Sequence, residues 1–228
     1  MLECVLFDLD GLLVDSEPLQ YRAYRYAFAQ FDIDLSLDDW IRWHSAEAST
    51  ARWVESEGLQ LDVQQLRDTK KQYYDELIAN ELSLKPGARA LIEDCAAGLQ
   101  LAVVSASRRE SIEACLDKFD LLQHFSSLVS GSELARSKPW PDPYLGAMRA
   151  LETSARHAIA LEDSLTGYRS ASAAGLKCVI CPDHFMPKPQ AAFATAALVT
   201  DALTELSASE LRRVLLGGAG QPRTRLST

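Results

Sequence analysis

The stretch that decides the fold is Cys4-Val-Leu-Phe-Asp8-Leu-Asp10-Gly11, a short apolar run that ends in two carboxylates. A continuous apolar run of this length is typical of a strand buried on both faces of a parallel sheet. Residues two apart on an extended chain point to the same side, so Asp8 and Asp10 lie nearly on one face. A helix-capping role would account for one of these acids but hardly for both. The stretch therefore predicts a buried strand with a charged site at its end.

Apolar runs of the same kind recur along the chain, and helical patterns separate them. The further runs are 101–104, 128–129, 158–161, 178–180 and 197–199. Between two of them, Ile112, Cys115, Leu116 and Phe119 follow the i, i+3, i+4, i+7 spacing of an amphipathic helix. This alternation predicts an α/β fold, a doubly wound parallel sheet with helices on both faces. In such folds ligands bind beyond the carboxyl ends of the strands, so the residues after each strand matter most.

One long segment breaks the alternation. Residues 15–84 show helical periods without a strand-like run, and they precede a helix that Pro86-Gly87 opens. We therefore expect an α/β core formed by 1–14 and 85–216, with 15–84 inserted as an all-helical domain. The insertion carries fourteen acidic and seven basic residues, so most of the net charge of −9 belongs to it.

Composition and charge exclude several classes of protein. With 47% apolar and 24% charged residues, the 228-residue chain is neither disordered nor fibrous. A net charge of −9 disfavours nucleic acid and anionic membranes as partners, because both are negatively charged. No apolar run approaches the ~20 residues of a membrane span, and the first residues lack the basic stretch of a signal peptide. We expect a cytoplasmic protein with reduced cysteines, monomeric or weakly dimeric, whose Gly-rich residues 217–228 form a flexible tail.

A second acidic pair follows another apolar run. Glu162 and Asp163 come directly after 158–161, and they precede a helix that opens at Ser164-Leu-Thr-Gly167. Either acidic pair alone is compatible with helix capping. Two pairs at the ends of two strands favour a hard divalent cation bound by oxygen atoms, most naturally Mg²⁺.

Two other strand ends carry groups that suit a phosphate. Ser105-Ala-Ser107 offers hydroxyl and backbone N–H groups close to a helix start, which is a geometry that binds anions. Lys138 lies in the segment Ser137-Lys-Pro-Trp-Pro-Asp-Pro143, whose prolines hold a loop extended. A lysine is more often a solvated surface residue, but its place between a strand and a helix favours a functional role.

In this order the motifs resemble the haloacid-dehalogenase superfamily. The matching stretches are Phe7-Asp8-Leu-Asp10-Gly11-Leu-Leu-Val-Asp15-Ser16, Ser105-Ala-Ser107, Ser137-Lys-Pro-Trp-Pro-Asp-Pro143 and Leu161-Glu-Asp-Ser-Leu-Thr-Gly167. The chain is similar to the β-phosphoglucomutase-like branch, which includes sugar-phosphate phosphatases, and the likeness spans residues 1 to about 200. The helical insertion stands where that branch has its mobile cap domain.

The resemblance implies a Mg²⁺-dependent phosphatase that acts on a small phosphate monoester, a sugar or sugar-acid phosphate. Asp8 would be the nucleophile that forms an aspartyl-phosphate, and Asp10 would be the general acid and then the general base. Mg²⁺ would be bound by Asp8, by the backbone carbonyl of Asp10 and by Asp163, with Glu162 as a ligand directly or through water.

The resemblance also implies the contacts of the substrate. Ser105, the N–H of Ala106 and Lys138 would hold the transferring phosphoryl group. Further candidate substrate contacts are Gly11, Ser16, Gln20, Arg42, His44, Arg52 and Ser107.

The insertion departs from the mutases of this branch at two positions. Gln20 stands where those mutases carry a cap histidine, and Ala46 where they carry an arginine that binds a second phosphate. A glutamine cannot exchange protons near neutral pH, so these differences favour a phosphatase over a β-phosphoglucomutase, which is the alternative. Arg42, His44 or Arg52 could replace the missing groups, although each is also compatible with a solvated helix face.

Two other activities are less compatible with the sequence. A haloacid dehalogenase needs no metal, whereas this chain retains Asp10 and the pair Glu162-Asp163. A phospho-accepting signalling receiver also uses a doubly wound sheet, an acidic strand end and a Lys-Pro loop. Such a receiver is usually a single domain of ~120 residues, and it has neither a helical insertion nor an acidic pair after the lysine.

Overall fold

The computed structural model describes residues 1–46, 48–185, 190–217 and 223–225. Its contacts divide the chain into two compact units, Met1–Val14 with Leu84–Thr228 and Asp15–Ser83. Leu84 belongs to the first unit, one residue away from the expected boundary, because it pairs with Val14 in an isolated β-bridge.

The first unit is built on a parallel sheet, which confirms the predicted doubly wound α/β fold. Its strands, in the order β3-β2-β1-β4-β5-β6-β7, are Ser127–Ser130, Gln100–Ser105, Cys4–Phe7, Ala158–Glu162, Lys177–Ile180, Leu198–Thr200 and Arg223–Arg225. The chain runs outward from β1 through β2 to β3, and then returns to place β4 on the other side of β1. Ligands of such sheets bind where the strand order reverses, which here is the space beyond β1 and β4.

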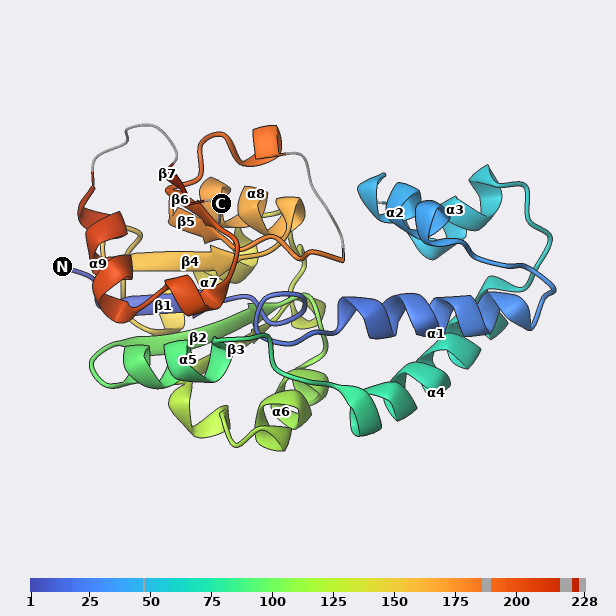
Figure 1. Cartoon of the computed structure of the whole chain (residues 1–228), viewed down its shortest axis with the longest axis horizontal. Helices are drawn as coiled ribbons and strands as arrows, with labels where there is room; N and C mark the ends of the chain where they lie inside the picture. Colours follow the sequence, from blue (N-terminus) through green and yellow to red (C-terminus); the bar gives the residue numbers. More distant parts are fainter. Residues whose placement is uncertain (47, 186–189, 218–222, 226–228) are drawn as a thin grey trace. The chain divides into compact units, whose positions relative to one another are not determined.

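Helices lie on both faces of this sheet (Figure 1). They are α5 (Ala88–Ala96), α6 (Arg109–Lys118), α7 (Asp142–Ala150), α8 (Leu165–Ala173) and α9 (Ala208–Leu216). Alternate strand residues such as Cys4 and Leu6 are buried in one apolar cluster with Tyr144 and Met148 of α7 and Ala171 of α8. Burial of both faces explains why β1 is apolar at every position.

The second unit is all-helical, with α1 (Glu17–Ala29), α2 (Leu37–Ser45), α3 (Thr50–Ser56) and α4 (Val63–Glu81). Hydroxyls of Ser36 and Ser49 accept backbone N–H groups and begin α2 and α3, as preferred N-cap residues do. The tryptophans of these two helices, Trp40, Trp43 and Trp53, are buried in the core of this unit.

The expectation of a flexible tail differs from the structure at three residues. Arg223–Arg225 form β7, which pairs in parallel with β6 and extends the sheet at that edge. We expected irregular structure because the segment is rich in glycine and has no hydrophobic period. A strand of three residues is too short to produce such a period. Residues 218–222 and 226–228 lie outside the described residues.

The five cysteines are free thiols, four of them buried and Cys181 partly buried. Within the described ranges, no helix is both long enough and apolar enough to cross a membrane.

Candidate active site

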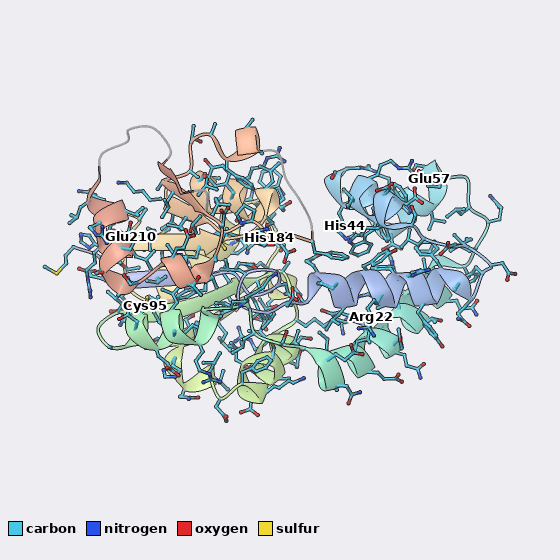
Figure 2. The ribbon with its side chains drawn as sticks, viewed as in Figure 1. Arg22, His44, Glu57, Cys95, His184 and Glu210 are labelled. Carbon is cyan, nitrogen blue, oxygen red and sulfur yellow. The ribbon has the colours of Figure 1, made fainter. Side chains whose placement is uncertain are left out.

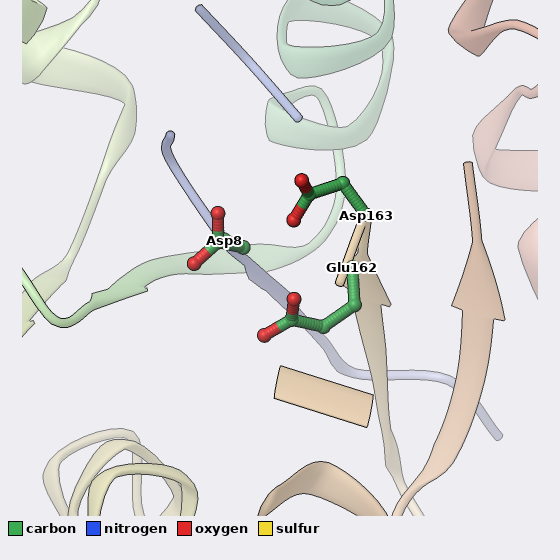
Figure 3. A group of neighbouring side chains, drawn as sticks. All are labelled: Asp8, Glu162 and Asp163. Carbon is green, nitrogen blue, oxygen red and sulfur yellow. The ribbon is translucent and has the colours of Figure 1, made fainter. Parts of the chain in front are cut away.

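Three carboxylates meet beyond the ends of β1 and β4. Phe7 pairs with Leu161 across these strands, and the Asp8 N–H donates to the Leu161 carbonyl at 3.0 Å, so the residues that follow leave the sheet together. One oxygen of each of Asp8, Glu162 and Asp163 lies within 4.8 Å of the others, and all three residues are buried. Figure 3 shows the three side chains converging from the two strand ends.

Lys138 lies directly against two of these carboxylates. Its Nζ is 2.5 Å from Oδ1 of Asp8 and 2.6 Å from Oε1 of Glu162. The lysine side chain is only 6% exposed. The loop between β3 and α7 thus brings an ammonium to the charged ends of β1 and β4.

The charges of this group are not balanced. Burial raises the pKa of the Asp8 carboxyl well above its usual range; Lys138 opposes this shift, while the charges of Glu162 and Asp10 add to it. Burial alone would lower the pKa of Lys138, but the charges of Asp8 and Glu162 and their hydrogen bonds together raise it. Burial is the main cause of the raised Asp8 pKa, and the carboxylates around the single ammonium add to it and also raise the pKa of Lys138.

This surplus and the donor set fit a hard divalent cation. Asp8, Glu162 and Asp163 offer only oxygen atoms, which are the ligands that Mg²⁺ prefers. Buried like charges at this separation repel, and a divalent cation would neutralise them. The residues of the site therefore fit the predicted Mg²⁺.

Glu162 is held by several protein groups. Tyr144 donates its hydroxyl to Oε1 at 2.6 Å, and Ser164 donates to Oε2 at 3.3 Å. Gly167 in the first turn of α8 leaves room for this carboxylate, since a Cβ there would lie 2.0 Å from its atoms. Burial, and then the charge of Glu162, raise the pKa of Tyr144 well above its usual range, so the phenol remains a hydrogen-bond donor.

Gly11 is needed beside Asp163 for two reasons. Its φ is +82°, in the left-handed region that side chains disfavour. A Cβ at Gly11 would also lie 2.3 Å from Oδ2 of Asp163. The tight turn after Asp10 thus allows the backbone to pass close to the carboxylates.

Asp10 is bound by the loop that follows β2. Its Oδ2 accepts from the hydroxyl of Ser107 at 2.8 Å and from that of Ser105 at 3.2 Å. The Ser107 N–H donates to Oγ of Ser105 at 3.0 Å, and Ala106 between them is exposed. The carboxylate of Asp10 therefore bonds to the candidate phosphate-binding loop, and it is not one of the three grouped carboxylates of Asp8, Glu162 and Asp163.

A fourth buried carboxylate lies next to this site. Asp183 follows β5, and its Oδ2 is 2.6 Å from Nζ of Lys85, with the aspartate side chain 1% exposed. The Cβ position of Gly11 is 2.3 Å from Asp163 Oδ2 and 3.5 Å from Asp183 Oδ2, so the two carboxylates are near neighbours. Lys85 follows the bridge between Val14 and Leu84, where the chain re-enters the core.

The other predicted substrate contacts belong to the helical unit. Ser16 is fully buried just before α1, and Gln20 accepts a hydrogen bond from Lys70. Arg52 is exposed in the first turn of α3. Ser16 and Gln20 thus lie one turn apart at the start of α1, while Arg52 belongs to a different helix of this unit.

Arg42 and His44 of α2 already have partners inside that unit. Arg42 forms ion pairs of 2.9 Å with Asp39 and with Glu57. The ring centroid of His44 lies 3.6 Å from that of Trp40, and its Nδ1 is 3.1 Å from the Trp40 carbonyl. Figure 2 shows His44 and Glu57, the partner of Arg42, in this unit.

Sequence reasoning missed several residues that contact the site. Tyr144 and Met148 are spaced as on the apolar face of a helix, a pattern that indicates core residues. This pattern does not reveal that the Tyr144 hydroxyl bonds to Glu162. Asp183 and Lys85 were not singled out, although Asp183 follows a predicted strand and the rule that led to the other carboxylates would have found it.

Comparisons with known proteins agree with this geometry. The family model of the haloacid dehalogenase-like hydrolases matches residues 5–181. Protein CbbY of Cereibacter sphaeroides is 32% identical over 219 residues, which make up 90% of this chain and 94% of that protein. Hexitol phosphatase B of Escherichia coli (strain K12) is 30% identical over 223 residues, or 90% of this chain and 95% of that protein.

A solved structure shows the same fold. The crystal structure of a CbbY variant from Rhodobacter sphaeroides, in complex with xylulose-(1,5)bisphosphate, has a TM-score of 0.77 and 29% identity to this chain. The similarity covers 90% of this chain and 96% of that one. Family membership removes the signalling receiver as an alternative. The chain belongs to the haloacid dehalogenase-like hydrolase family.

Proposed function

We propose that this chain is a Mg²⁺-dependent phosphatase that hydrolyses a sugar or sugar-acid phosphate through an aspartyl-phosphate on Asp8. One observation carries the proposal: Asp8 lies just after β1, with its carboxylate against the ammonium of Lys138 and within 4.8 Å of carboxylate oxygens of Glu162 and Asp163. The phosphatase name of one relative and the phosphorylated sugar bound to another support the substrate class.

In the first step Asp8 attacks the phosphorus of the monoester. A bond forms between the Asp8 carboxylate and phosphorus, and the bond from phosphorus to the leaving oxygen breaks. Asp10 gives that oxygen a proton, so the alcohol leaves neutral. Asp8, Asp163, Glu162 and the Asp10 carbonyl would hold Mg²⁺, which would supply the positive charge that lets a carboxylate approach an anionic phosphate.

In the second step Asp10 acts as a base. It takes a proton from water, whose oxygen attacks phosphorus, and the bond to Asp8 breaks to release inorganic phosphate. The hydroxyls of Ser105 and Ser107, which donate to the Asp10 carboxylate, keep it on the side of the phosphate-binding loop. Lys138 holds the transferring oxygens and offsets the charge that Asp8 brings.

The test is phosphate release from a panel of phosphorylated sugars, sugar acids and bisphosphates, with Mg²⁺ and with a chelator. We expect turnover that requires Mg²⁺ and is abolished by Asp8→Asn, because the variant lacks the attacking charge. Asp75→Asn is the matched control, since Asp75 is an exposed partner of Lys71 in the helical unit and should turn over normally. The proposal is wrong if no member releases phosphate, or if Asp8→Asn retains near-normal rates.

The alternative activity, a β-phosphoglucomutase, predicts different products from the same site. A mutase must protect its aspartyl-phosphate from water until a sugar phosphate rebinds, and it must bind a second phosphate. Gln20, bound to Lys70, and Ala46 stand where the mutases have their proton-exchanging and phosphate-binding groups. We expect β-glucose 1-phosphate with a bisphosphate activator to give inorganic phosphate only. Formation of glucose 6-phosphate faster than free phosphate would favour the mutase.

A further inference from the structure

Tyr144 is a polar residue in an apolar environment. It lies in the first turn of α7, is fully buried, and packs in the cluster that contains Leu6, Ala102 and Cys178 of neighbouring strands. Phenylalanine would fill such a place equally well by its apolar surface. The phenolic hydroxyl therefore needs a reason of its own.

That reason lies in the carboxylate of Glu162. The Tyr144 hydroxyl donates to Oε1 at 2.6 Å, and Nζ of Lys138 donates to the same oxygen at 2.6 Å. Nζ of Lys138 also lies 5.3 Å from the centre of the Tyr144 ring. Two donors from one loop and helix thus converge on a single oxygen of a residue that is 0% exposed.

Other protein groups surround the remaining sides of the Glu162 carboxylate. Gly167 of α8 lies so near that even a methyl group would overlap Glu162, and Ser164 contacts the second oxygen at the longer distance of 3.3 Å. Steric contact restricts where the carboxylate lies, but it does not fix the rotation of the carboxylate plane relative to Lys138. The hydrogen bond from Tyr144 helps to fix this rotation, because it is short and made to the charged oxygen that Lys138 also contacts.

We propose that Tyr144 is a positioning residue of the phosphatase: its hydroxyl fixes the rotation of the Glu162 carboxylate, so that Oε1 anchors Lys138 against Asp8 and Oε2 stays out of that contact. This inference rests on the proposed function. Tyr144 acts through Glu162, so its loss changes the arrangement of Lys138 and of the cation ligands without removing any group that meets the substrate.

The test compares Tyr144→Phe with Tyr168→Phe. Tyr168 is buried in the same apolar cluster, and its hydroxyl bonds to Thr195, away from the carboxylates. Each variant loses one hydroxyl and one hydrogen bond from the same core. We expect kcat to fall about tenfold in Tyr144→Phe with KM changed less than about twofold, because groups that orient metal ligands and catalytic residues have effects of this size. Tyr168→Phe should keep both constants.

A second readout does not depend on turnover. Mg²⁺ that binds only the native state raises the melting temperature, and the concentration for half of this rise reports its affinity. We expect this concentration to increase about tenfold in Tyr144→Phe and to stay unchanged in Tyr168→Phe. Should the wild type release no phosphate from any substrate, this shift would still support the role of Tyr144 while the proposed function fails.

A double-variant cycle tests whether the effect passes through Glu162. In a Glu162→Ala background, Tyr144→Phe should lower kcat less than about twofold further, because the hydroxyl has lost its acceptor. The inference is overturned if Tyr144→Phe matches Tyr168→Phe in both kcat and Mg²⁺ dependence. It is equally overturned if Tyr144→Phe remains about tenfold slower when Glu162 is already alanine.

Discussion

Replacing Lys138 by methionine removes the ammonium between Asp8 and Glu162 and keeps a side chain of similar length. The lost contacts are 2.5 Å and 2.6 Å long, and the lysine side chain is 6% exposed. Removing one partner of a buried ion pair leaves an uncompensated buried charge, which costs about 3–5 kcal/mol of unfolding free energy. In a chain of this size, each kcal/mol of lost stability lowers Tm by about 2–4 °C, so Tm should fall by about 6–20 °C.

The size of this loss should depend on pH, and the sign follows from the pKa of Asp8. Because the native pKa of Asp8 is raised, the native state holds a proton at pH values where the unfolded chain has released it. Without Lys138 this native pKa rises further, so lowering the pH stabilises the variant more than the wild type. Lys138 has a raised pKa and is charged in both states below about pH 10, so it adds no pH dependence of its own there. We expect a smaller difference at pH 5 than at pH 8.

The measurement is urea unfolding of metal-free protein, followed by far-ultraviolet circular dichroism. Tryptophan fluorescence would mix signals from both units, because Trp40, Trp43 and Trp53 lie in the helical insertion whereas Trp140 lies in the α/β unit. Lys71→Met is the matched control. It removes an ion pair with Asp75 whose side chains are 63% and 57% exposed, and such pairs contribute about 0–1 kcal/mol.

Two results would refute this reasoning. A loss of less than about 1 kcal/mol at pH 8, equal to that of Lys71→Met, would mean that Lys138 does not compensate buried charge. A loss that is the same at pH 5 and pH 8 would mean that the carboxylates left behind do not take up a proton.

Three further changes test neighbouring parts of the site. Asp163→Asn should abolish the rise in Tm that Mg²⁺ gives the wild type, about 5–11 °C at a hundredfold excess over Kd, and an equal rise in the variant would exclude Asp163 as a ligand. Gly167→Ala should lower the unfolding free energy by about 1–3 kcal/mol because its Cβ would overlap Glu162, and an unchanged urea midpoint would contradict the close approach. Lys85→Met should cost about 3–5 kcal/mol in the same assay, since Asp183 is 1% exposed, whereas a loss below about 1 kcal/mol would show that the pair is not buried in solution.

Much of the fold could be predicted because its signals are local. The apolar run Cys4–Phe7 is β1 as expected, since burial on both faces requires an apolar side chain at every position. The helical insertion was visible for the same reason, as a long segment with a single period. Arg223–Arg225 show the limit of such signals, because a strand of three residues at a sheet edge is defined by its partner β6.

In the candidate site, too, some features could be predicted from local sequence and others depended on the tertiary structure. Sequence alone indicated Asp8, Asp10, Glu162 and Asp163, because each lies at the end of a recognisable strand or within three residues of it, and parallel strands end at one edge of a sheet. It did not determine which carboxylates meet. The strand order determined which carboxylates lie together, because it places β4 next to β1. Asp10 instead accepts a hydrogen bond from Ser107 in the loop after β2.

Only the tertiary structure decided how Glu162 is held and what lies beside Asp163. Tyr144 contacts Glu162 because α7 packs on the sheet with its first turn at the strand ends, and Lys85, next to the bridge between Val14 and Leu84, meets Asp183, which follows β5. A helical period records which residues are buried, but not which neighbour a buried hydroxyl or ammonium will meet. Those partners are far apart in sequence, and their distances are set by the packing of whole elements, which no local pattern encodes.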